Sequence, residues 1–127
     1  MRKRSILLPV LVLGLVGLVD WGSLALLANA CSDRQSMADR EYELAKQVKS
    51  AAQQLALKSD DHVKAATLPM NVRNALIEML QIQSSINGTS APTLGDDSDF
   101  WVNWLDSGNA NLNLQIGKAS YSWLNVE

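Results

Sequence analysis

The groups in this sequence best suited to chemistry are the histidine at position 62 and the two carboxylates before it, Asp60 and Asp61. Imidazole and carboxylate groups together can bind a metal ion or exchange protons. Adjacent residues of a helix point in different directions, however, so this run does not bring its three side chains to one point. We therefore interpret it as the solvated start or corner of a helix, and we predict no metal site.

No other group of residues predicts catalysis. Asp96 and Asp99 resemble an acid–base pair in type, but they flank a loop-forming segment in which clustered carboxylates are ordinarily solvated. The sequence has a single histidine, no HExxH or CxxC motif and no glycine-rich phosphate loop. No nucleophile motif surrounds any serine. We therefore predict that the chain is not an enzyme and has no cofactor; a small secreted enzyme or enzyme inhibitor is a minor alternative.

The single cysteine, Cys31, follows a segment that has the three parts of an export signal. Residues 2–4 are basic, residues 6–19 form an apolar run of 14 residues, and residues 28–30 read small-x-small. This order predicts a protein that is exported from the cytoplasm and faces the periplasm.

The N-terminal 31 residues also resemble a bacterial lipoprotein signal sequence, in which a cysteine after small residues carries the lipid. Ala30 fits the position before the cysteine, whereas Asn29 and Ala28 depart from the usual pattern. The resemblance implies lipidation of Cys31, and Ser32 in the next position implies sorting to the outer membrane.

Residues 6–30 are alternatively a retained anchor in the inner membrane. A helix of these 25 residues, at about 1.5 Å each, exceeds the roughly 30 Å of hydrocarbon. Asp20 would then lie near the middle of the span, at a cost of about 2.5–3.5 kcal/mol. Cleavage without lipidation is the third interpretation. The first two interpretations predict a domain held to a membrane through its N-terminus.

Length and charge bound the remainder of the chain. The 127 residues allow one domain of modest size. Residues 31–127 contain 8 basic and 12 acidic residues, a net charge of −4. Nucleic-acid binding requires a basic face, so we predict no nucleic-acid partner.

Two helices are predicted between residues 31 and 89, and together they form a helical hairpin. Residues 33–66 lack glycine and proline, and their composition favours a helix with a turn near Ser59. Residues 69–86 form the second helix, since Pro69 suits a first turn and Gly88 suits a stop. The first helix has one narrow, alanine-rich apolar stripe at helical spacing, which predicts packing against another helix, either in this chain or in a partner. Its members are Leu44, Val48, Ala51 and Leu55.

Residues 90–98 are predicted to be a linker loop, followed by an aromatic-rich segment at residues 99–127 that packs on the hairpin. This segment contains five of the seven aromatic residues of the chain. We expect a short helix over residues 99–106, which brings Trp101 and Trp104 together at i, i+3. Alternating apolar residues at 112–116 and a further segment at 121–126 predict a small β-hairpin. A single helix over residues 109–124 is the alternative.

The three tryptophans of this segment, Trp101, Trp104 and Trp123, have two interpretations. They are either the large residues of a small core or a binding surface for a partner. The sequence as a whole predicts a mainly α protein with a structural or protein-binding role in an envelope, secretion, pilus or phage-lysis assembly. Its predicted partner is another envelope protein or a second copy of itself. A periplasmic ligand-binding or sensory helical module is the alternative.

Overall fold

The computed structural model describes the backbone of residues 15–127 and the side chains of residues 33–127. Most of the predicted export signal and the side chain of Cys31 therefore lie outside the described residues. The first helix, α1 (Leu15–Gln54), runs through two separate compact units, residues 1–36 and 37–127, of which the second is described here. In the described part of the chain, no helix combines the length and the apolar character needed to cross a membrane.

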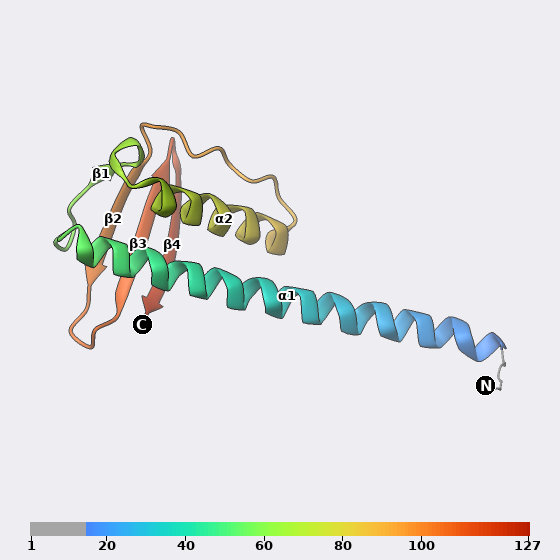
Figure 1. The fold of residues 1–127 in the computed structure, drawn as a ribbon. Helices are drawn as coiled ribbons and strands as arrows, with labels where there is room; N and C mark the ends of the chain where they lie inside the picture. The colour runs from blue at the N-terminus through green and yellow to red at the C-terminus, as the bar shows by residue number, and fades with distance from the viewer. Residues whose placement is uncertain (1–14) are drawn as a thin grey trace. The chain divides into compact units, whose positions relative to one another are not determined.

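Residues 37–127 form two layers, with helices on one face of an antiparallel sheet (Figure 1). The sheet has four strands in the order β1-β2-β3-β4, so each strand pairs with its neighbour in sequence. α1 and α2 run in opposite directions across the same face. The elements after α1 are β1 (Val63–Lys64), the 3-10 helix η1 (Ala65–Thr67), α2 (Met70–Asn87), β2 (Asp99–Trp104), β3 (Ala110–Ile116) and β4 (Ala119–Val126).

The core lies between the helices and the inner face of the sheet. Successive side chains of a strand point to opposite faces, so alternate residues of β2 and β3 are buried. The helices cover these residues with apolar side chains, and each large one contributes roughly 1.5–3 kcal/mol when fully buried. The largest fully buried side chains are Phe100, Leu76, Met79, Leu80, Leu112, Leu114, Val48, Val102 and Val126.

The prediction of a mainly α protein is wrong, because the fold is a mixture of helices and a four-stranded sheet. The error began at residues 99–106, where β2 replaces the predicted short helix. Phe100 and Val102 are buried at a spacing of two, whereas the prediction gave weight to the i, i+3 spacing of Trp101 and Trp104. Pairing with β1 on one side and β3 on the other makes β2 an interior strand. The alternative of one helix over residues 109–124 is also wrong, since β3 and β4 occupy this range.

The first helix ends at Gln54, well before the predicted end near residue 66. Ala56 has a positive φ of 57°, a conformation that no helix continues. A turn follows, in which the Asp61 carboxylate accepts a hydrogen bond of 2.7 Å from the backbone N–H of Lys58. Val63 then pairs with Phe100 in the sheet. Strand pairing at a distance therefore overrides the helical propensity of this segment.

The second helix and the β-hairpin are confirmed. α2 spans Met70–Asn87 and ends at Gly88, whose φ of 70° is the left-handed conformation of a C-cap. β3 and β4 pair through a two-residue turn, since Ile116 lies opposite Ala119. Gly117, the first turn residue, has a φ of 59°, which suits a type II′ turn.

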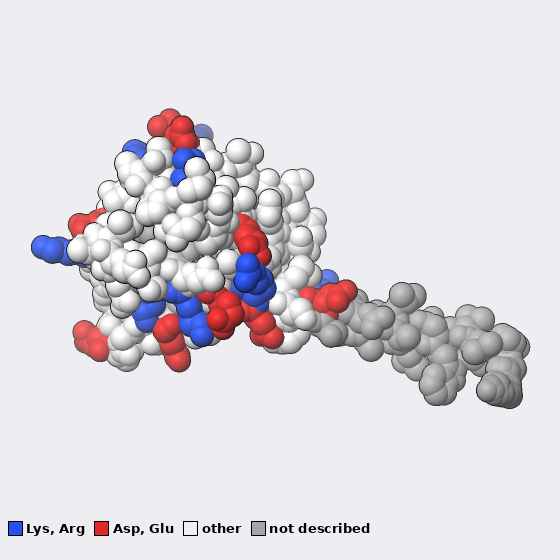
Figure 2. Space-filling model, in the orientation of Figure 1, with Lys and Arg blue, Asp and Glu red and all other residues white. Residues whose placement is uncertain are grey.

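An ion pair joins the two helices on the outside. The Arg40 guanidinium of α1 donates two hydrogen bonds to the Glu78 carboxylate of α2, at 2.8 and 3.1 Å. The hydrogen bond from Arg40, together with its charge, lowers the pKa of Glu78 below its ordinary value. Charges of both signs are interspersed over the α1 side of the molecule rather than gathered by sign (Figure 2).

We expect Glu78→Gln to lower the urea midpoint of unfolding at neutral pH, and the loss to disappear in acid. The folded-state pKa of Glu78 is lowered, so its stabilisation is complete above the ordinary glutamate pKa of about 4.3 and is lost as the pH falls through the folded value. The measurement is the midpoint of wild type and variant from pH 7 downwards. Glu43→Gln is the control, because Glu43 pairs with Lys46 within α1. A difference that persists at the lowest pH with folded protein would contradict the assignment.

Candidate functional site

The apolar stripe predicted to bind a partner faces the sheet of its own domain. Leu44 is 2% exposed and Val48 is 1% exposed, and both belong to the core. Ala51 is partly buried and packs against that core. Leu55 lies one residue beyond the helix and is 43% exposed. The stripe therefore packs within its own chain, in the core that α1 shares with α2 and the sheet.

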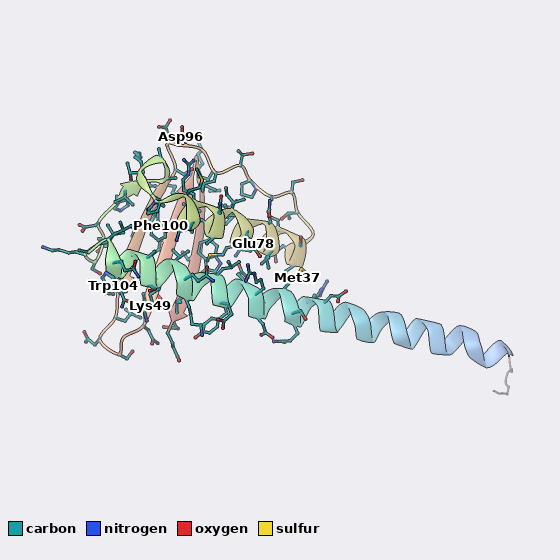
Figure 3. The ribbon with its side chains drawn as sticks, in the orientation of Figure 1. Met37, Lys49, Glu78, Asp96, Phe100 and Trp104 are labelled. Atoms are coloured by element: carbon teal, nitrogen blue, oxygen red, sulfur yellow. The ribbon has the colours of Figure 1, made fainter. Side chains whose placement is uncertain are left out.

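Two of the three candidate tryptophans hold the domain together. The Trp123 indole N–H donates to the Glu41 carboxylate of α1 at 2.7 Å, and its ring is almost fully buried. The Trp104 indole N–H donates to the Leu57 carbonyl at 2.8 Å, which attaches the turn after α1 to the end of β2. Near Trp104 in Figure 3, the Lys49 amine donates to the Gly108 carbonyl in the β2–β3 loop. These contacts are structural.

Trp101 lies on the opposite, outer face of the sheet. Its ring stacks on His62, with 4.3 Å between ring centroids and an interplanar angle of 18°. The asparagines of β3 on this face are already bonded within the domain. Asn113 accepts from the Ser122 hydroxyl at 2.9 Å, and the Asn111 side-chain oxygen accepts from the backbone N–H at position 125 at 2.9 Å. On the outer face the side-chain oxygens of Asn111 and Asn113 are therefore engaged within the domain.

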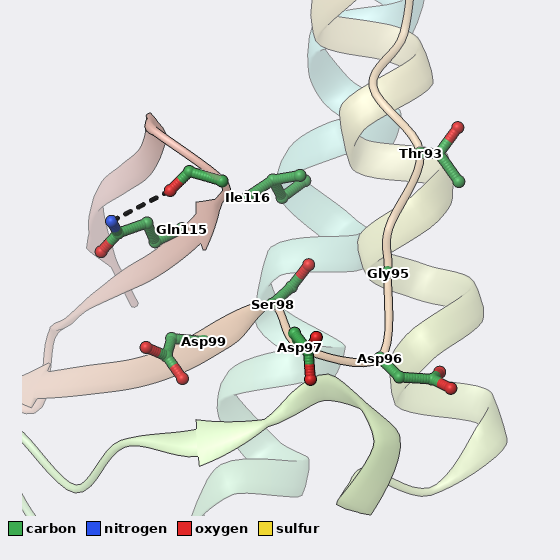
Figure 4. A pocket seen from close by; sticks show the side chains of 9 residues that line it. Thr93, Gly95, Asp96, Asp97, Ser98, Asp99, Gln115 and Ile116 are labelled. Atoms are coloured by element: carbon green, nitrogen blue, oxygen red, sulfur yellow. Dashed lines mark hydrogen bonds between the residues drawn. The ribbon is translucent and has the colours of Figure 1, made fainter.

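An acidic hollow of about 330 Å³ lies where the loop before β2 meets the β3–β4 turn (Figure 4). Two of its three carboxylates form ion pairs: Asp96 with Arg73 at 2.9 Å and Asp99 with Lys64 at 2.8 Å. The hydrogen bond from Lys64 lowers the pKa of Asp99, so this carboxyl is ionised and is a poor proton donor. Among the described residues, no cluster of histidine, cysteine and acidic residues is arranged to bind a metal ion. Asp96 and Asp99, the two carboxylates compared with an acid–base pair in the sequence, are thus each bound to a cation of the same domain.

The remaining candidate is the outer edge of β4, the last strand in the sheet order. In an antiparallel ladder, alternate residues direct their backbone N–H and C=O groups to opposite neighbours. Ile116 and Ala119 close the two-residue turn, so Ala119, Tyr121 and Trp123 face β3. The backbone groups of Ser120 and Ser122 consequently face the free edge.

Over residues 119–123 this edge lacks the features that usually protect a sheet edge. Natural edge strands carry charged residues, proline or a bulge that discourages pairing with another chain. β4 has no charged residue and no proline, and its one irregularity lies near its end, between the positions opposite Ala110 and Leu112. The regular stretch over residues 119–123 is open to another strand.

Two hollows of about 290 Å³ each lie between β4 and the helices. The first is polar and lies between the end of α2 and residues 120–122. The second lies between α1 and residues 122–126, and half-exposed Tyr42 lines it. Side chains of a bound partner could enter these two hollows, which lie on the helical side of β4.

This edge was not among the sites predicted from the sequence. The strand at residues 121–126 was predicted, but not the position of β4 as the last strand of the sheet. The absence of charge in Ala119–Val126 was the available signal. Comparison of the chain with protein-family models, with curated proteins and with solved structures gives no match.

Proposed function

We propose that this chain is an exported, membrane-attached protein of a bacterial envelope assembly, and that residues 37–127 are its protein-binding domain. The partner adds a strand to the edge of β4. In this mode of recognition, backbone hydrogen bonds supply affinity and side chains on either side of the edge supply specificity.

The observation that carries the proposal is the uncharged free edge of β4, flanked by two hollows on the helical side. Two of the three carboxylates of the acidic hollow are ion-paired, and Asn111 and Asn113 on the outer face bond within the domain, whereas the edge of β4 presents backbone groups that no other described strand pairs. The export signal and Cys31 support attachment to a membrane through the N-terminus.

The test is photo-crosslinking in cells that express the full-length chain. A photoreactive phenylalanine analogue replaces Leu124 in β4 or, as the matched control, Met70 at the start of α2; both side chains are 66% exposed. We expect a covalent adduct in the membrane fraction from position 124 and none of comparable yield from position 70.

Ser120→Pro in the same background supplies the second arm. Its N–H faces the free edge, so proline leaves the pairing of β4 with β3 intact and removes one donor from the edge. We expect the adduct to disappear while the circular dichroism spectrum of the purified chain is unchanged. An adduct that survives Ser120→Pro, or equal adducts from positions 124 and 70, would refute binding through this edge.

A further inference from the structure

We infer that the strand added to β4 is the β4 of a second copy of this chain, antiparallel to the first and with Ser122 opposite Ser122 on the two-fold axis. The inference rests on the proposed function, because it names the partner of the same edge. The product is a continuous eight-stranded sheet whose helices all cover one face.

The backbone groups of the edge fit this register. Ser120 and Ser122 direct their N–H and C=O groups outward, and Leu124 follows two residues later, where the irregularity of β4 begins. With Ser122 on the axis, each Ser122 forms a hydrogen-bonded pair with its equivalent. Ser120 of each copy then lies opposite Leu124 of the other. Ser120 and Ser122 of one copy are thus paired with Leu124 and Ser122 of the other, and not with residues whose backbone groups bond to β3.

The side chains also match across the axis. This register puts Tyr121 of one copy opposite Trp123 of the other, and it does so twice because the interface is two-fold symmetric. Directly opposed aromatic side chains on one face stabilise an antiparallel pair. Both aromatics lie on the helical side, with the core residues Leu112 and Leu114 as their partners in β3.

The charges that bracket β4 select a second copy in antiparallel orientation. Lys118 precedes the strand and Glu127 follows it, and both are exposed. Antiparallel pairing about Ser122 puts Lys118 of each copy opposite Val126 of the other, so Lys118 and Glu127 come within one residue of facing each other. Parallel pairing would instead bring lysine to lysine and glutamate to glutamate. Opposite charges across a strand pair stabilise it and like charges destabilise it.

The experiment uses charge placed on the axis. Ser122→Lys puts two ammonium groups opposite each other in the proposed pair, and Ser122→Glu does the same with two carboxylates. Each full-length variant is purified in detergent, and its protein mass is measured by size-exclusion chromatography with light scattering. We expect wild type to have the mass of a dimer, each variant alone that of a monomer, and an equimolar mixture of the two variants that of a dimer again.

Lys58→Glu and Lys118→Ala serve as further variants with defined outcomes. The exposed Lys58 lies in the turn between α1 and β1, at the opposite end of the sheet order from β4, so its substitution changes the charge without affecting the dimer. Lys118→Ala weakens the dimer, because it removes both of the flanking charge pairs.

A mixture of the Ser122 variants that stays monomeric would overturn the inference, as would wild type that is monomeric at every concentration. The crosslinking experiment separates this failure from failure of the proposed function. Suppose that the adduct from position 124 has a mass other than twice that of the chain and disappears in Ser120→Pro. The partner then adds a strand to β4, as the proposed function states, but it is a different protein.

Discussion

Phe100→Ala is expected to destabilise residues 37–127 by about 3–5 kcal/mol, the usual cost of removing a buried phenylalanine ring. Phe100 is 1% exposed and belongs to the central core. The loss is a large fraction of the roughly 5–15 kcal/mol that stabilises an ordinary domain. We expect a clear fall in the urea midpoint, or failure to fold at room temperature, measured by far-ultraviolet circular dichroism.

Trp101→Ala is the matched control, because it removes a larger ring from the adjacent position. Trp101 lies on the outer face, where its loss costs the stacking on His62 and cross-strand contacts, about 1 kcal/mol. The two variants thus compare adjacent residues of β2 whose side chains lie on opposite faces of the sheet. A greater loss from Trp101→Ala than from Phe100→Ala would contradict the assignment of β2.

Leu44→Ala is expected to destabilise the domain by about 2–5 kcal/mol and to leave partner binding at β4 unchanged in whatever folded protein remains. The Leu44 side chain is packed between α1 and the sheet, so alanine leaves a cavity. Stability is measured by urea unfolding, and binding by the yield of adduct from position 124.

Leu55→Ala provides the comparison within the same predicted stripe. Leu55 is 43% exposed beyond the end of α1, and surface substitutions of this kind usually change stability by no more than about 0.5 kcal/mol. If Leu44→Ala reduced the adduct at full stability, the stripe would be a partner surface after all. Equal losses of stability from Leu44→Ala and Leu55→Ala would also contradict the described packing.

The elements that the sequence predicted well have local causes. α2 has a proline at its start and a glycine at its end, and both act within one turn of the helix. The β3–β4 hairpin has strict alternation in residues 112–116 and a glycine at the first position of its turn. Such signals depend on the backbone preferences of a few neighbouring residues, so they can be recognised without the fold.

The elements that it predicted poorly depend on distant partners. Residues 99–104 are short enough to fit either a helical or a strand period, and their pairing with residues 63–64 and 110–115 decides between them. The turn after Gln54 likewise exists because Val63 must reach Phe100. Neither pairing has a signal within its own segment.

The same division applies to the candidate site. The sequence by itself determined the order of basic, apolar and small residues from which export is predicted, the single cysteine, the net negative charge and the absence of charge in residues 119–126, because these are properties of composition and order. The tertiary structure alone decided that the α1 stripe and two of the tryptophans are used internally, and that β4 lies at the edge of the sheet. The physical reason is that burial and an unpaired backbone edge are relations between segments, which exist only after the helices and strands have packed.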